Sequence, residues 1–173
     1  WNEFGTIVEM EPENPIISFA DAKVKALCVA NWDTNNDGEL DEAEAAAVTD
    51  LGTVFKGNTE ITSFNELKYF AELTTIGIDA FYGCSHLASI AIPSSLTMVR
   101  KGAFKDCHSL SKVIVSDIAV WCGIIYDGDD YNGDFPLGIA HHLYSDEDTE
   151  ITDLVIPEGV TKIEARAFRD AQY

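Results

Sequence analysis

One seven-residue pattern occurs three times in this chain of 173 residues. Its copies are Leu87-x-x-Ile90-x-Ile92-Pro93, Leu110-x-x-Val113-x-Val115-Ser116 and Ile151-x-x-Leu154-x-Ile156-Pro157. The first two copies belong to a longer match with a period of 23 residues, which also pairs Ala80-Phe81 with Ala103-Phe104. A fixed period of about 20 to 50 residues is the signature of stacked repeats, in which no unit buries its apolar face without neighbours. We therefore predict an α+β solenoid with units of about 23 residues and short stacked strands.

The composition excludes several classes of protein. With 46% hydrophobic residues the chain can bury a substantial core, and it has no run of about 18 apolar residues that would span a membrane. Eleven Lys and Arg against 30 Asp and Glu give a formal net charge of -19, which repels phosphate backbones and anionic lipid headgroups. Nucleic acid is therefore not expected as a partner. The same charge favours solubility and the binding of calcium.

Two cysteines, Cys84 and Cys107, occupy the same position in successive units. Stacked strands place equivalent positions about 4.8 Å apart, within reach of a disulfide, but the parallel directions of the two side chains disfavour that bond. We interpret both as small buried apolar residues, and the cysteines do not decide the redox compartment.

The chain divides into two parts. Residues 1–60 hold an irregular lead-in, a helix expected from about Ser18 to Trp32, a polar stretch, and a second helix expected from about Asp41 to Val48. Residues 61–173 hold the repeats, which we expect to begin with an imperfect strand at residues 61–67. The helix-loop-helix module therefore lies where the cap of a repeat array belongs.

Each unit offers strand positions that face outward. Leu87, Ile90 and Ile92 point toward the core, so the residues that alternate with them point away from it. The positions that we expect to line one outer face are Ser63, Ser89, Ala91, Lys112, Ile114, Asp153 and Val155. This face is a candidate binding surface with little charge, although small strand residues are also what a solvated sheet needs.

One unit is expanded, at about residues 116–150. The step from Val115 to Ile156 is 41 residues rather than 23. Insertions in repeat arrays form surface loops, where ligands often bind, so Trp121 and Tyr126 join the candidate binding surface. The alternative is that Trp121 fills a widened core together with Phe135.

Residues 33–44 match the calcium-binding loop of a helix-loop-helix module. Gly38 allows the sharp turn at position six, and Leu40 is the apolar residue that packs inward at position eight. The expected ligands are Asp33, Asn35, Asp37, the backbone carbonyl of Glu39, Asp41, and both carboxylate oxygens of Glu44. We expect Ca²⁺ to bind here, and the alternative is an acidic loop without an ion.

No second calcium loop is evident. The acidic run from Asp127 to Asp134 has Phe135 where the loop needs glycine and His141 where it needs a bidentate carboxylate. A single loop favours a structural ion over a calcium sensor, and millimolar calcium outside cells suffices for a dissociation constant of about 10⁻⁴ to 10⁻³ M. On a strand, His141 and its neighbour His142 cannot converge on one ion.

The sequence contains no motif for catalysis. A Gly-x-Ser-x-Gly elbow, a His-Glu-x-x-His pair, a phosphate-binding loop and a dinucleotide-binding glycine pattern are all absent. We therefore predict no catalytic residues and no enzymatic activity. The enzymatic alternative is a carbohydrate-active enzyme with paired carboxylates such as Asp127 and Asp130, which would have to lie about 5 to 9.5 Å apart in a groove.

The unit from Ile76 to Pro93, of the form Ile-Gly-x-x-Ala-Phe-x-Gly-Cys-x-x-Leu-x-x-Ile-x-Ile-Pro, resembles the BspA-type leucine-rich repeats of bacterial surface proteins, which are abundant in Bacteroidetes. The resemblance covers residues 61–173, and the segment from Phe19 to Glu44 is similar to half a dockerin. It implies a secreted or cell-surface protein, often lipid-anchored, that has no enzymatic activity and takes part in adhesion. The chain departs from the pattern at Ala171, where cysteine is expected.

These patterns support two functions. The first is a calcium-stabilised, monomeric binding module, which contacts a protein or glycan ligand on host or neighbouring cells through the strand face and the expanded unit. The second is a spacer or assembly module, in which the calcium segment engages a partner as a dockerin does and the repeats extend the molecule.

Overall fold

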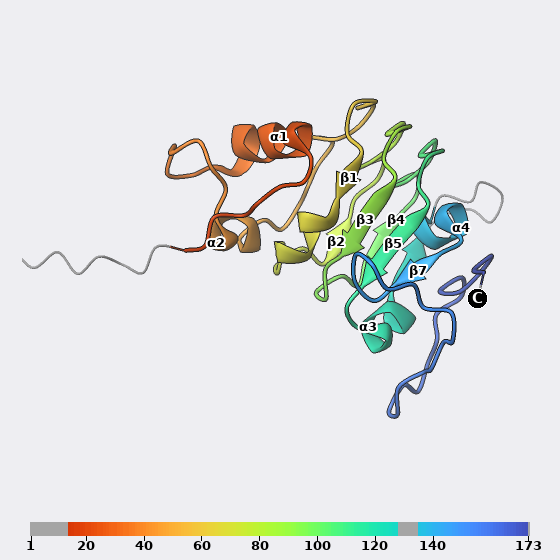
Figure 1. Cartoon of the computed structure of the whole chain (residues 1–173). Coiled ribbons are helices and arrows are strands. Elements are labelled where there is room, and N and C mark those ends of the chain that lie inside the picture. The colour runs from red at the N-terminus through yellow and green to blue at the C-terminus, as the bar shows by residue number, and fades with distance from the viewer. Residues whose placement is uncertain (1–13, 128–134, 173) are drawn as a thin grey trace, which may run out of the picture.

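The computed structural model describes residues 14–127 and 135–172. Two helices come first, α1 (Ala22–Trp32) and α2 (Glu42–Ala46), and the strands of the repeats follow them (Figure 1). Each helix begins at an aspartate, Asp21 or Asp41, whose carboxylate accepts hydrogen bonds from backbone N–H groups of the first turn. Both helices expected from the sequence are therefore present, and the second ends two residues earlier than expected. Within the described ranges, no helix has the length and apolar character needed to cross a membrane.

The repeats form two sheets, each made of parallel strands, because each regular unit contributes one strand to each sheet. The four-stranded sheet has the order β1 (Ser63–Phe64), β3 (Ser89–Ile92), β5 (Lys112–Val115), β7 (Leu143–Tyr144). The three-stranded sheet has the order β2 (Thr75–Ile76), β4 (Met98–Arg100), β6 (Ile125–Asp127). The other elements are the 3-10 helix η1 (Asn65–Tyr69) and the helices α3 (Ile118–Gly123) and α4 (Pro136–Ala140). The pairing of Ile90 with Val113 follows the register expected from the 23-residue period.

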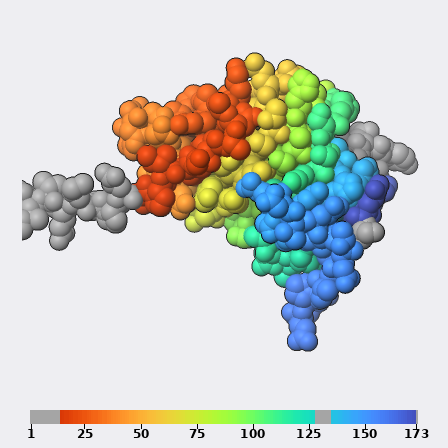
Figure 2. Space-filling model, viewed as in Figure 1, coloured from red at the N-terminus to blue at the C-terminus, as the bar shows by residue number. Residues whose placement is uncertain are grey.

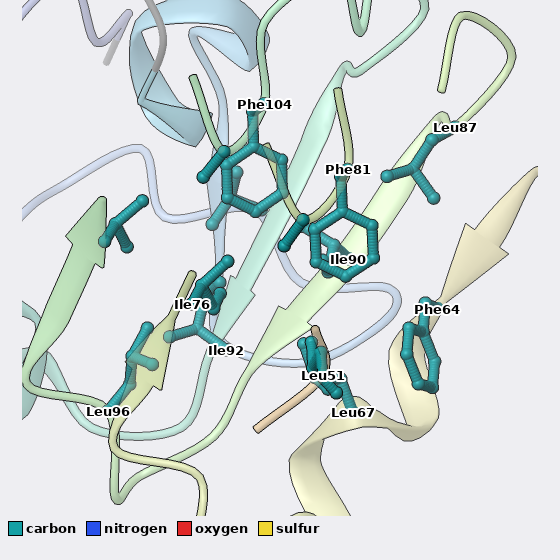
Figure 3. Packing of buried hydrophobic residues seen from close by; sticks show 14 of the residues in the cluster. Leu51, Phe64, Leu67, Ile76, Phe81, Leu87, Ile90, Ile92, Leu96 and Phe104 are labelled. Carbon is teal, nitrogen blue, oxygen red and sulfur yellow. The ribbon is translucent and has the colours of Figure 1, made fainter. Parts of the chain in front are cut away.

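The core is a continuous cluster of apolar side chains that runs from α1 through the successive units. Figure 3 shows Phe81 and Phe104 at equivalent places in this cluster, and their rings stack with centroids 5.2 Å apart. Phe55 stacks on the other side of Phe81 at the same distance. Each unit therefore covers the aromatic ring of the next, as expected for repeats that bury their apolar face only against neighbours.

The buried cysteines form a second repeated contact. Cys84 and Cys107 are free thiols, and each donates a hydrogen bond at 3.0 Å to a backbone carbonyl of the preceding unit, Cys84 to Phe55 and Cys107 to Phe81. This confirms that both are small buried residues rather than a disulfide. Each of these carbonyls also accepts a backbone hydrogen bond within its turn, from the N–H of Asn58 or Cys84, so the thiol is a second donor to it.

Two buried carboxylates join the N-terminal module to the first strand unit. Asp21 accepts hydrogen bonds from the backbone N–H of Thr62 at 2.6 Å and from its hydroxyl at 2.8 Å. Glu66, in η1, accepts a hydrogen bond from the backbone N–H of Ala20 at 2.9 Å. The module is therefore held by directed polar contacts in addition to apolar packing.

The strand expected at the third copy of the pattern is not formed, and this prediction was wrong. Residues 153–156 lie outside the strands, and the place beside β5 is taken by β7, where Leu143 pairs with Val113. The reason is that α4 brings the chain back to the sheet 30 positions after Val113, before the copy at Leu154 is reached. Asp153 is therefore exposed away from the sheet face, and Val155 is 72% exposed.

Candidate functional site

A groove with a volume of about 510 Å³ lies over the outer face of the four-stranded sheet. Ala91 and Ile114, which are paired in register across β3 and β5, line its floor. They are only 2% and 7% exposed although they point away from the core, because walls rise on both sides. One wall is η1, and the other is the β7 loop, residues 145–149, which follows β7. Figure 2 shows the blue atoms that follow β7 next to the yellow atoms of the first unit.

Two lysines fasten the β7 loop over the sheet. The Lys112 amine donates a hydrogen bond to the backbone carbonyl of Glu147 and lies 4.4 Å from the centroid of the Tyr144 ring. The Lys68 amine, on η1, lies 3.6 Å from the carboxylate of Glu147. At the base of the loop, the Nδ1 atom of His142 lies 2.6 Å from the Glu150 carboxylate. These contacts give the groove its second wall.

The outward strand residues expected from the sequence lie together on this face, with two exceptions. Ser89, Ala91, Lys112 and Ile114 occupy it in two adjacent rows, and the Ser89 hydroxyl donates to the side chain of Asn65 at 2.9 Å. Asp153 and Val155 do not share it, because no strand forms there.

The prediction that the expanded unit exposes aromatic contact residues was wrong for Trp121. This residue is 1% exposed, and its indole N–H donates to the backbone carbonyl of Ala167 at 2.7 Å. Tyr126 packs edge-on against Trp121 with centroids 6.2 Å apart, and burial raises the pKa of its hydroxyl. Trp121 and Phe135 are both buried in the widened core, as in the alternative interpretation, and Tyr126 packs against both rings.

Sequence reasoning missed both walls of the groove. Asn65 and Lys68 belong to η1, where a strand was expected, and Ser145 to Asp148 follow a strand of only two residues. A signal for the second wall is present in the sequence, because Leu143-Tyr144 is followed at once by a run of turn-forming residues.

The loop at residues 33–44 makes the sharp turn expected at its sixth position. Asn36 and Gly38, at positions four and six, have φ angles of 62° and 86°. The Asp33 carboxylate accepts hydrogen bonds from the N–H groups of these two residues, at 2.6 Å and 2.9 Å. Leu40 at position eight is fully buried, as expected. The expected ligands Asn35, Asp37, Glu39 and Asp41 lie along this loop, and the Glu39 side chain is engaged by Lys25 at 2.5 Å.

Glu44 closes the loop. Burial opposes the ionisation of its carboxylate, but hydrogen bonds from the N–H groups of Asp41, Thr34 and Asn35 lower its pKa below the usual value. Its side chain therefore reaches back across the loop while it caps α2. In the described parts of the chain, no group of three or more His, Cys, Asp or Glu side chains is drawn together as a metal site. The fit to calcium thus rests on the oxygen donors and the backbone shape.

The lead-in supplies backbone partners for the loop at residues 33–44. Ile17 donates a hydrogen bond to the carbonyl of Leu40, and Glu42 donates one to the carbonyl of Pro15, both at 2.9 Å. Ile16 and Asp41 form an antiparallel bridge between these bonds. Because buried backbone groups need partners, this pairing lets a single loop stand without a second one beside it.

The two histidines and the acidic run do not form a further site among the described residues. His141 donates through Nδ1 to the backbone carbonyl of Asp170 at 2.8 Å, whereas His142 contacts Glu150, so the two rings do not converge. Asp127 pairs with Arg100 at 3.2 Å. Asp130 and the rest of the run to Asp134 lie outside the described residues.

Comparison with known families agrees with this geometry. The family model described as "BspA type Leucine rich repeat region" matches six copies, at residues 53–121 and 139–173. The first match includes Phe55, whose ring stacks on that of Phe81. The gap between the two matches falls in the expanded unit. Comparisons with curated proteins and with solved structures gave no match. Because the matched residues make up more than half of the chain, this protein belongs to the family of BspA-type leucine-rich repeat proteins.

Proposed function

We propose that this chain is a protein-interaction module of a secreted or cell-surface protein, and that it holds its partner in the groove over the four-stranded sheet. Leucine-rich repeats generally act as non-catalytic binding modules, and stacked repeats present extended surfaces to their partners. The observation that carries the proposal is the groove itself. A sheltered apolar floor between polar walls is the usual construction of a binding site.

The proposal extends to adhesion, in which the repeats form a solenoid and the partner belongs to a host or a neighbouring cell. Residues 33–44 then bind Ca²⁺ through the oxygen atoms of Asp33, Asn35, Asp37, Glu39, Asp41 and Glu44. The ion supplies stabilisation and no chemistry: it neutralises the carboxylates of the loop and fixes α1 relative to α2. The shape of the loop and the pairing of Leu40 and Asp41 with the lead-in support this role.

The groove can be tested by filling it. The Ala91→Trp variant places an indole on the floor, and the Val155→Trp variant is the matched control, because Val155 is exposed outside the sheet. We expect the wild type and the control to bind at least one member of a panel of immobilised extracellular-matrix proteins, and the Ala91→Trp variant to bind it at least tenfold more weakly. Circular dichroism melts check that both variants fold.

Two results would count against the proposal. Equal binding by a folded Ala91→Trp variant would exclude the groove as the contact surface. Loss of binding only when residues of the calcium loop are changed, with the groove variant unaffected, would favour the spacer or assembly function.

A further inference from the structure

The two walls of the groove differ in charge. The β7 loop contributes three consecutive carboxylates, those of Asp146, Glu147 and Asp148. Among the described residues that line the groove, Lys68 on η1 is the one cationic side chain. The groove therefore presents an acidic wall, an apolar floor and a single lysine opposite.

The three carboxylates are not equally available to a ligand. Asp146 accepts hydrogen bonds from the backbone N–H groups of Asp148 and Thr149, both at 2.9 Å, and these bonds lower its pKa and commit it to the turn. Glu147 shares an exposed ion pair with Lys68, and exposed pairs contribute little to stability. In the described part of the chain, the Asp148 carboxylate has neither a hydrogen bond nor an ion pair. Glu147 and Asp148 are thus the groups that can receive a cation.

The apolar floor indicates what kind of group the rest of the ligand carries. Ala91 and Ile114 offer an apolar strip beside these carboxylates, and none of the described residues that line the groove is aromatic. Long basic side chains lay their aliphatic stem on such a surface and keep the charged end in water or against a carboxylate. A sugar ring lacks the aromatic platform on which it could stack.

We infer that the partner enters this groove with a lysine or arginine side chain of an extended segment, flanked by apolar residues. The stem of that side chain lies on Ala91 and Ile114, and its cationic end lies between Glu147 and Asp148. The formal net charge of -19 attracts a basic partner at long range and repels an acidic one. This inference rests on the proposed function, because it names the chemistry of the partner for the same groove.

Synthetic peptides test the inference without knowledge of the natural partner. The probe is acetyl-Ala-Ile-Arg-Ile-Ala-amide, titrated into ¹⁵N-labelled protein while backbone amide shifts are followed, a method that detects weak binding. Its controls carry citrulline or glutamate in place of arginine. We expect shifts at Ala91 and Ile114 with the arginine peptide, and an affinity at least about tenfold lower with either control peptide.

Two variants with opposite expected effects on peptide affinity make the test more specific. Asp148→Asn removes a carboxylate and should weaken binding of the arginine peptide about tenfold, whereas Lys68→Gln removes the internal competitor and should strengthen it. Asp153→Asn, outside the sheet, is the matched control and should leave the affinity for the arginine peptide unchanged.

Three results would each overturn the inference. They are equal binding of the three peptides, shifts confined to other surfaces, and shifts at the floor with a neutral oligosaccharide alone. If the peptides fail but Ala91→Trp still abolishes binding of a matrix protein, the proposed function stands and only the basic ligand is excluded.

Discussion

Asp21 joins the first helix to the first strand unit through both oxygens of one carboxylate. One oxygen accepts the N–H groups of Lys23 and Val24 at the start of α1, and the other accepts the N–H and the hydroxyl of Thr62. The residue is 7% exposed, so water cannot replace these partners. A single side chain at this place therefore couples the N-terminal module to the repeats.

Replacing Asp21 by alanine should lower the free energy of unfolding by about 2 to 4 kcal/mol. Loss of the helix cap costs about 0.5 to 2 kcal/mol, and the unpaired N–H of Thr62 accounts for the rest. Urea denaturation followed by circular dichroism measures the change. Asp153→Ala is the control, since an exposed aspartate without such contacts should change the value by less than about 0.5 kcal/mol. A loss equal to that of the control would show that the junction is held by apolar packing alone.

The carboxylate of Asp21 should also make the free energy of unfolding depend on pH. Burial opposes its ionisation, but the hydrogen bonds from Thr62, Lys23 and Val24 outweigh burial and hold the pKa of Asp21 below the ordinary value of 3.8. A depressed pKa in the folded state contributes stability above the unfolded pKa, and this stability is lost as the pH falls through the folded value. The difference in unfolding free energy between the wild type and Asp21→Asn should be constant above about pH 5 and shrink below pH 3.8. A difference that stays constant down to pH 2 would contradict this.

At the scale of elements, the period of the sequence predicted the regular units, and the expanded unit was the part that it could not predict. The pairing of Ile90 with Val113 follows from the spacing, because each strand copies the one before it. β7 has only two residues, Leu143 and Tyr144, too few to show an alternation of apolar and polar positions. The calcium-loop pattern is local and its backbone shape could be foreseen. A turn after Leu143-Tyr144 could also be foreseen, but its position over the sheet could not, because long-range contacts such as that between Lys68 and Glu147 hold it there.

The N-terminal module should be stabilised by calcium. With a dissociation constant of about 10⁻⁴ M, 1 mM calcium adds about 1.4 kcal/mol, which corresponds to a rise in Tm of roughly 3 to 6 °C for a chain of this size. Glu44→Gln should abolish the rise, because it removes the ligand expected to be bidentate. Glu42→Gln, in the same helix but at no ligand position, is the control and should keep the rise. Scanning calorimetry of chelator-treated protein with and without calcium makes the comparison, and an equal rise for both variants would place the ion elsewhere.

In the whole molecule, acidic side chains greatly outnumber basic ones. The net charge of -19 opposes the compact state, and the ion pairs of Lys23 with Glu60 and of Lys56 with Asp79 are exposed and weak. Raising the salt concentration from about 0.01 M to 0.1 M shortens the screening length from about 30 Å to 10 Å. We therefore expect sodium chloride to raise the Tm in the presence of a chelator, which keeps calcium out of the comparison. A lower Tm at higher salt would mean that the ion pairs outweigh the repulsion.

The stacked rings of Phe55, Phe81 and Phe104 also bear on how such genes change length. Phe81 stacks on Phe55 on one side and on Phe104 on the other, so the same ring contact recurs from unit to unit. Because repeats contact mainly their neighbours, a duplicated or deleted block of about 23 residues can leave the remaining junctions as they were. Unequal recombination can thus lengthen or shorten the array without a new core having to evolve. The expanded unit breaks this translational symmetry, because its loop is held by Lys112 of the neighbouring strand. The groove therefore stays next to the expanded unit, however many identical units are inherited upstream of β1.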